Sequence, residues 1–338
     1  MKKTYIALAA SAAFAVAGTA AADGHGGSLS ISANYQAQVM SVDADVEEDG
    51  IYMNDGTFDG RSNWGRVNIG GSHDLGNGMR AVYGLNTNVG MFGFSDPGDR
   101  DLDADDVSAN DIIGNRKVFA GLAGDFGTIR LGRLNTSYNT AGKDPLNATF
   151  MQARAYGGML GGAGGYGNGG YRDGVVRYDS SFGDVAVSAS LLTDAASDGD
   201  EEHGFAAFVE APVGPVGVYA AVMAAEDTRG WDGARGSDAT KLGVTYSDGP
   251  MSFLFQYEDV DFWGGDEQEH MLLSGQFELS ADSSVVVNYG MEDERDVDYI
   301  AAGYLQDMGE NTRFHVGFMN SDNGAETTVI GGGLRVSF

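Results

Sequence analysis

The 338-residue sequence has no cysteine and only five prolines. The lack of cysteine excludes disulfide bonds and thiolate metal sites. Beyond residue 22 there is no run of eighteen consecutive apolar residues, so the sequence offers no transmembrane helix. Basic residues are also few, since 20 Lys and Arg stand against 49 Asp and Glu. Such an acidic chain is not expected to bind nucleic acid.

The first 22 residues differ from the rest of the chain. MKKTYIALAASAAFAVAGTAAA has two lysines, then an apolar run, then small residues ending in three alanines. This order predicts a secretory signal peptide cleaved before Asp23. The alternative is a short anchoring helix, but no stop-transfer segment follows. Cleavage leaves 316 residues, enough for one large domain over 23–338, with 18 basic and 49 acidic side chains and a net charge of −31.

Glycine is abundant, with 53 residues, and many short segments alternate between apolar and polar side chains. In MSFLFQYE (251–258), Phe253 and Phe255 share one parity, while Gln256 and Glu258 share the other. Alternation with period two predicts strands that have one apolar and one polar face. About sixteen strands are expected, near 28–42, 61–74, 79–88, 111–122, 127–133, 174–181, 185–193, 204–213, 216–226, 238–247, 251–258, 267–278, 283–292, 297–305, 312–320 and 326–338.

Two kinds of connector alternate between these strands. Short turns such as LGNG (75–78) and SDGP (247–250) are followed by long Gly- and Asp-rich segments such as 43–60 and 89–111. This asymmetry, with an even number of strands, is typical of a transmembrane antiparallel β-barrel. The rival class, a soluble exported β-sandwich, requires neither feature. We therefore predict an all-β membrane barrel.

The last eight residues, GGGLRVSF, also alternate. Leu334, Val336 and Phe338 share one parity, and Arg335 has the other. We expect this segment to pair with 28–39 and so close the barrel, which removes the sheet edges. Phe338 would then lie at the seam, on the lipid side.

The charges are distributed unevenly. The long connectors hold 36 of the 49 acidic residues, whereas most bases lie in predicted strands. An arginine facing lipid near the midplane costs about 2–4 kcal/mol, so these bases are expected to face the lumen. Polar side chains that point inward from most strands require water, which predicts a charged, water-filled channel. His315 shares this inward parity and could titrate there.

One connector, 134–172, is long but poor in acids. A connector of this length in a compact barrel is usually functional. Its low charge suits it to folding inward against the wall. Asp144 is its only acid between Asn135 and Tyr171, and Lys143 and Arg154 accompany it.

The segments 62–86, 115–138 and 172–191, with the terminal Phe338, resemble the general diffusion porins of Gram-negative bacteria, over essentially the whole mature chain. The resemblance implies a sixteen-stranded barrel, a homotrimer in the outer membrane, and a third long loop that narrows the pore. It also implies that wall arginines face acids on that loop. The terminal phenylalanine resembles the signal that the barrel-assembly machinery reads.

By motif, three wall arginines are carried over from that family: Arg66, Arg116 and Arg172. Arg61 and Arg177, which lie in predicted strands, complete the expected constriction wall. Asp144, Lys143 and Arg154 are the candidates on the loop. The sequence departs from the family in lacking the Pro-Glu-Phe-Gly-Gly-type acidic motif. The transverse field is therefore weaker, or its acid comes from Asp173 or another loop.

The expected function is passive diffusion of small hydrophilic solutes and ions, with a weak cation preference from the acidic connectors. No cofactor is expected. The acidic connectors either form a solvated face or bind divalent cations that bridge to lipopolysaccharide phosphates. Two rivals are a barrel with a plugged lumen in a structural or adhesive role and a barrel enzyme. The adjacent Ser72-His73-Asp74 cannot form a catalytic relay, because neighbouring strand residues point to opposite faces.

Overall fold

Antiparallel strands make up nearly all of the regular structure. The computed structural model describes residues 20–21, 27–44, 50–54, 65–89, 113–140, 143–153, 171–193, 203–225, 237–262, 267–293, 297–322 and 326–338. The elements in chain order are β1 (Ala20–Ala21), β2 (Ser28–Ala44), β3 (Gly50–Asn54), β4 (Gly65–Gly76), β5 (Met79–Val89), β6 (Ile113–Gly124), β7 (Gly127–Leu134), α2 (Ser137–Thr140), β8 (Arg172–Phe182), β9 (Val185–Leu192), β10 (Gly204–Val213), β11 (Val216–Ala225), β12 (Ser237–Asp248), β13 (Met251–Phe262), β14 (Glu267–Ser280), β15 (Ser283–Glu292), β16 (Val297–Asp307), β17 (Thr312–Asp322) and β18 (Glu326–Ser337).

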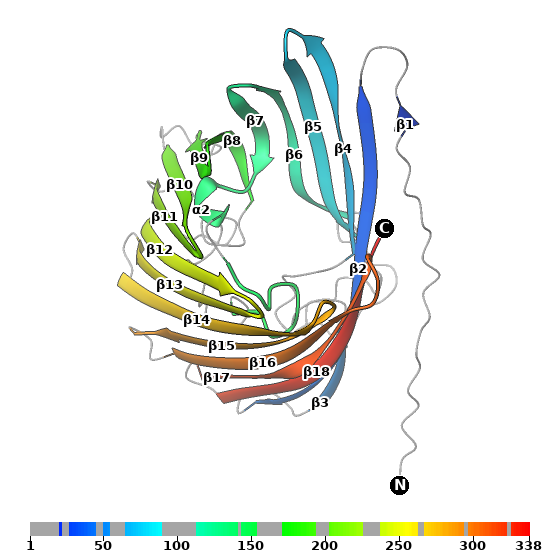
Figure 1. Cartoon of the computed structure of the whole chain (residues 1–338), viewed down its shortest axis with the longest axis vertical. Helices are drawn as coiled ribbons and strands as arrows, with labels where there is room; N and C mark the ends of the chain where they lie inside the picture. Colours follow the sequence, from blue (N-terminus) through cyan, green and yellow to red (C-terminus); the bar gives the residue numbers. More distant parts are fainter. Residues whose placement is uncertain are drawn as a thin grey trace, which may run out of the picture.

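Sixteen of these strands, β2 and β4–β18, form a closed ring in which each strand pairs with the next (Figure 1). The ring closes where β18 pairs with β2, from Thr327 opposite Ala44 to Ser337 opposite Asn34. Phe338 extends this seam, because its N–H donates to the Ala33 carbonyl at 2.8 Å and its carbonyl accepts the Ala33 N–H at 2.6 Å. The predicted barrel and its closure are confirmed.

The predicted alternation is realised as an outer apolar face and an inner polar face. On β13, Phe253 is 51% exposed on the outside, whereas Gln256 and Glu258 are 1% and 0% exposed on the inside. On β17, Val316 is exposed on the outside, while His315 is buried on the inside. An exposed apolar face of this kind suits a lipid environment.

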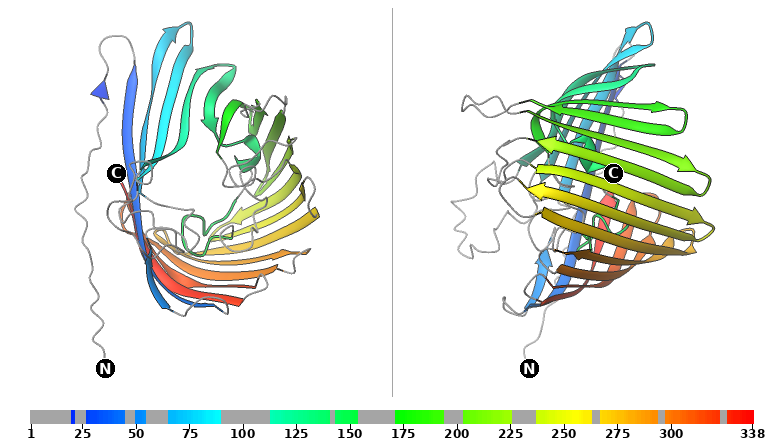
Figure 2. Two further views of the ribbon diagram at one scale, coloured as in Figure 1. Left: turned by 180° about the vertical axis from the view of Figure 1, so that it is seen from behind. Right: turned by 90° about the vertical axis from the view of Figure 1, so that its left-hand side faces the viewer.

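The short turns gather at one end of the ring, here named the short-turn end, as the side view shows (Figure 2). Between β4 and β5, Asn77 and Gly78 both have positive φ, at 55° and 76°. Two such residues form the tight hairpin turn whose twist matches that of the flanking strands. The strands agree with the predicted ranges to within about four residues.

Three elements were not expected from the sequence. The two-residue strand β1 lies within the predicted signal peptide and pairs with Ser28 and Leu29 of β2. The short strand β3 pairs with the second half of β2, from Gln38 to Val42. The single helical turn α2 follows β7 and lies inside the ring of strands (Figure 1). Among the described residues, no helix is long and apolar enough to cross a bilayer.

Candidate functional site: a constriction inside the barrel

The connector after β7 enters the lumen at α2, where it is held by serines of β9. The hydroxyl of Ser137 lies 2.7 Å from the hydroxyls of both Ser188 and Ser190, and its N–H donates to Ser190 Oγ at 2.9 Å. These small side chains alternate on the inner face of β9. They let the turn approach the wall closely while its polar groups stay hydrogen-bonded.

Tyr138 anchors the same turn to a buried ion pair. Its hydroxyl donates to Glu258 of β13, and the Lys241 ammonium of β12 lies 4.3 Å from the centre of its ring. Lys241 Nζ and Glu258 Oε1 are 3.5 Å apart, and both side chains are fully buried. Burial and the Glu258 carboxylate raise the pKa of Tyr138, so it remains a hydrogen-bond donor. Loss of one partner would leave an uncompensated buried charge.

Asp144 shapes the connector as it crosses the lumen. One carboxylate oxygen accepts the Leu146 N–H at 2.9 Å and the Asn288 amide of β15 at 2.8 Å. The other accepts the Ala153 N–H at 2.8 Å. The neighbouring Lys143 pairs with Glu210 of β10. Asp144 therefore closes the 144–153 segment into a compact loop and ties it to the far wall.

The tip of the loop, defined here as residues 149–152, rests on β2, β16 and β17. The Phe150 N–H donates to Gln38 Oε1 at 2.9 Å, and the Met151 carbonyl accepts the Tyr299 hydroxyl. Met151 lies on Gly303, where an added Cβ would come 2.7 Å from its methyl group. Residues 143–153 thus lie inside the ring (Figure 1) and contact its wall at β10, β15, β16 and β2.

The opposite wall, formed by β4 and β6–β8, is basic. A bulge on β6 places Lys117 opposite Asn86 but Asn115 opposite Thr87, so Arg116 is an extra residue. In a regular strand Arg116 and Lys117 would point to opposite faces. The bulge re-aims the first, and both cations lie over the ring of Tyr171, at 4.6 and 5.6 Å from its centre.

Tyr171 lies at the centre of this basic group. Arg116 donates to its hydroxyl at 2.7 Å. Burial raises the pKa of Tyr171, but Arg116, Lys117 and Arg66 favour the phenolate, and the net pKa lies below the usual value. Because Arg66 of β4 acts electrostatically on Tyr171, it belongs to the same basic group. Arg172, the first residue of β8, faces inward opposite the buried Leu134.

Two further arginines share one acid on this wall. Arg177 Nη2 lies 2.8 Å from Asp179 Oδ1, and Arg130 pairs with the other oxygen of the same carboxylate. Arg177 also donates to the carbonyls of Asn135 and Thr136 at 3.1 and 3.2 Å. It therefore holds the entry of the connector.

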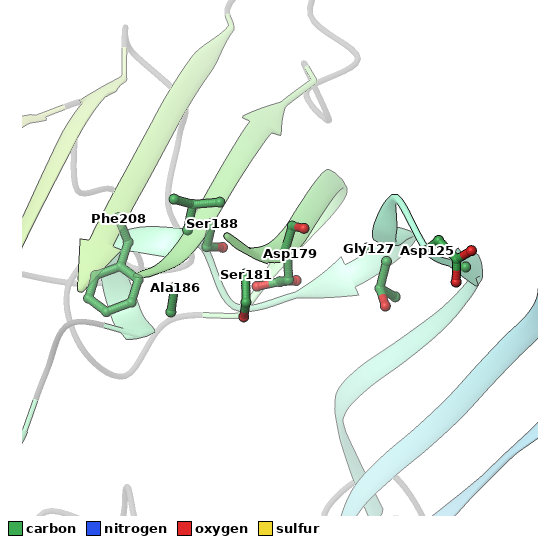
Figure 3. A pocket seen from close by; sticks show the side chains of 11 residues that line it. Asp125, Gly127, Asp179, Ser181, Ala186, Ser188 and Phe208 are labelled. Carbon is green, nitrogen blue, oxygen red and sulfur yellow. The ribbon is translucent and has the colours of Figure 1, made fainter. Parts of the chain in front are cut away.

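A recess of about 470 Å³ opens on the short-turn side of this wall (Figure 3). Asp179, Ser181, Ser188 and Phe208 lie along it, with Asp125 at the β6–β7 turn. Since Ser188 also bonds Ser137, the recess begins directly beside α2.

The predicted site residues divide into three groups. Arg66, Arg116, Arg172 and Arg177 lie together on the basic wall, while Lys143 and Asp144 lie on the connector. Asp173, an alternative acidic partner, pairs instead with Arg133 at 2.8 Å. Arg61 and Arg154 are outside the described residues.

Sequence reasoning missed Lys117, Tyr171 and the anchor of Tyr138 as parts of the site. Only Lys117 left a signal, since two consecutive bases interrupt the alternation of their strand. Tyr171 and Tyr138 lie in a connector, where alternation gives no information.

A closed antiparallel barrel with an apolar outer face, a charged lumen and an inward loop defines a channel of the outer-membrane β-barrel class. Residues 7–326 match the model of the Gram-negative porin family. The chain belongs to that family and is an outer-membrane porin of a Gram-negative bacterium. The predicted family, fold class and location are confirmed.

Individual relatives agree with this assignment. Outer membrane porin protein 32 of Delftia acidovorans is 25% identical, over 93% of this chain and 88% of its own. Major outer membrane protein P.IA of Neisseria meningitidis is 35% identical over 22% of this chain and 16% of its own. The anion-selective porin from Comamonas acidovorans has the same fold, with a TM-score of 0.72 at 18% identity over 92% of this chain and 100% of its own.

Proposed function

We propose that this porin lets small hydrophilic solutes and ions diffuse passively and that its constriction favours anions. The supporting observation is the excess of bases on the wall facing the inward connector. Among the described residues of β4 and β6–β8 around that connector, Asp173 pairs with Arg133, and one further acid, Asp179, stands against six bases, namely Arg66, Arg116, Lys117, Arg130, Arg172 and Arg177.

Three other acids on or near the loop have compensating partners. Glu210 pairs with Lys143, and Glu258 pairs with Lys241. Asp144 accepts three hydrogen bonds within the loop and from Asn288. The part of the connector beyond Ala153 adds Arg154 and no acid before Asp173. The local charge balance is therefore positive.

The acidic outer connectors led to the expectation of a weak cation preference, and this proposal reverses it. Charges in water are screened beyond about 8 Å at physiological ionic strength. An ion passing the constriction comes much closer than that to the guanidinium groups. The Comamonas porin is named as anion-selective, but its likeness here is one of fold, so the proposed sign rests on the charges of this chain.

Planar-bilayer recording with a KCl gradient tests the proposal. Large, stable, ohmic steps are expected, with a reversal potential of the sign for chloride preference. A reversal potential of the opposite sign would reject anion preference while leaving the channel intact. A purified protein that conducts nothing would favour the plugged barrel.

We further propose that the protein forms a homotrimer. OmpT of Vibrio cholerae, which is described in a trimer form, has the same fold with a TM-score of 0.67 at 12% identity. The match covers 93% of this chain and 100% of the OmpT chain. Binding of divalent cations and lipopolysaccharide remains a proposal for the long connectors, which lie mostly outside the described residues. Recognition of Phe338 by the assembly machinery is likewise proposed. Crosslinking and mass measurement of the native complex test the trimer.

A further inference from the structure

His315 of β17 is a buried titratable group that the proposed conduction path does not use. It faces inward, is 1% exposed, and lies beneath the tip of the loop. Its ring centre is 6.1 Å from that of Phe150. Gly333 of β18 makes room for it, because a Cβ there would come 2.7 Å from two atoms of the imidazole.

The hydrogen bonds around Gln38 define the protonation of this ring. Gln38 Oε1 accepts the backbone N–H of Phe150 at 2.9 Å. A backbone N–H can only donate, so the atom that it meets must be the amide oxygen. His315 Nε2 lies 2.9 Å from the same oxygen and therefore donates its proton to it. In the neutral ring, Nδ1 is then the nitrogen left to accept a proton.

Protonation of Nδ1 would place a third positive charge in a basic pocket. Arg313 lies two residues away on β17, and Arg335 of β18 lies opposite Arg313; both act electrostatically on His315. The carboxylate nearest in this row, Asp307 of β16, is already held by Arg313 through bonds of 2.6 and 2.9 Å. Within the described residues no acid forms an ion pair with His315.

Within the part of the chain that the structure describes, the other groups packed against the ring supply no compensating charge. The neighbours are Leu305 of β16, Gly333 of β18, Gln38 of β2 and Phe150 of the tip. A buried, uncompensated imidazolium is costly. Protons therefore bind better when the tip has left the wall and water can reach the ring. By linkage, falling pH shifts the population toward that released state.

We propose that His315 and Gln38 form an acid-sensitive latch that holds the tip of the loop against the wall at neutral pH and releases it in acid. The wall lies behind the tip, so a released tip moves into the lumen. The channel then passes to a lower-conductance state. This inference rests on the proposed conduction but not on its selectivity, which is measured at neutral pH with the latch closed.

Single-channel recording between pH 7 and pH 4 tests the latch with two matched variants. His315→Gln keeps a hydrogen-bond donor toward Gln38 but cannot gain a charge. His270→Gln is the control, because His270 is an equally buried inward histidine on β14, on another part of the wall. Wild type and H270Q are expected to lose about half or more of their conductance in acid, and H315Q to lose much less.

A second measurement separates movement of the tip from a simple charge effect. The chain has no cysteine, so a spin label on N147C, an exposed position next to the tip, reports only on this loop. Label mobility is expected to rise in acid in the wild-type background and to stay constant with H315Q. Equal acid responses in wild type and H315Q would overturn the latch. So would a conductance change without any change in label mobility. Circular dichroism at neutral pH, which reports the β-strand content, checks that both variants fold.

Discussion

Replacing Arg116 with glutamine removes one positive charge from the constriction and leaves a shorter, uncharged polar side chain. Arg116 lies over Tyr171 and donates to its hydroxyl at 2.7 Å. Loss of the guanidinium therefore also frees the phenol. Arg116→Lys is the companion variant, since it keeps the charge but not the planar fork.

The size of the effect follows from Coulomb's law. An ion passing about 5 Å from the guanidinium in water gains or loses roughly 0.8 kcal/mol, and screening at 0.1 M salt reduces this to about 0.5 kcal/mol. The effect has opposite sign for chloride and potassium, so their permeability ratio changes by about 1 kcal/mol, or roughly fivefold. In a tenfold KCl gradient this change moves the reversal potential by roughly 20–30 mV toward zero. The reversal potential of a perfectly selective channel in this gradient is about 59 mV.

The assay is the reversal potential of each variant in the same gradient. Arg80→Gln is the control, because Arg80 is an exposed arginine at the short-turn end of β5. We expect a shift of only a few millivolts for it, since water screens its charge. R116K should stay near wild type. Equal shifts for R116Q and R80Q would refute the argument that the constriction sets the selectivity.

Three further predictions concern the supports of the constriction. The pKa of Tyr171 is lowered, and its phenolate cancels nearby positive charge. Anion preference should therefore fall as pH rises toward 10, and the reversal potential of Tyr171→Phe should not change over this pH range. Lys241→Met should lower the free energy of unfolding in urea by about 3–5 kcal/mol, and adding Glu258→Gln should recover much of it; additive losses would contradict the buried pair. Gly303→Val should push Met151 and the tip off the wall and change single-channel conductance at neutral pH; an unchanged conductance would show that the tip does not define the pore.

The strands could be predicted because their signal is local. Alternation along 251–258 requires only that successive side chains point to opposite faces, and the structure has this arrangement in β13. The closing strand was predictable for the same reason. Its hydrogen bonds reach back to Ala33, where the first barrel strand shows the matching pattern.

The constriction was only partly predictable. Because a charge in lipid is costly, arginines in the strands were predicted to face the lumen, and this rule identified Arg66 and Arg177. The same rule could not place both Arg116 and Lys117 inside, because a bulge on β6 overrides the alternation there. Asp144 was recognised as the lone acid of its connector, but its carboxylate contacts Asn288, 144 residues further on. No sequence pattern links the two.

The sequence by itself determined the class of the protein: the number of strands, the inward and outward faces, and the asymmetry of the connectors. These properties depend on nearest neighbours along the chain and on the cost of placing polar groups in lipid. The tertiary structure decided which side chains meet across the lumen. His315 meets Gln38 over a separation of 277 residues, because closing the ring fixes the register of every strand and so brings distant inner faces together.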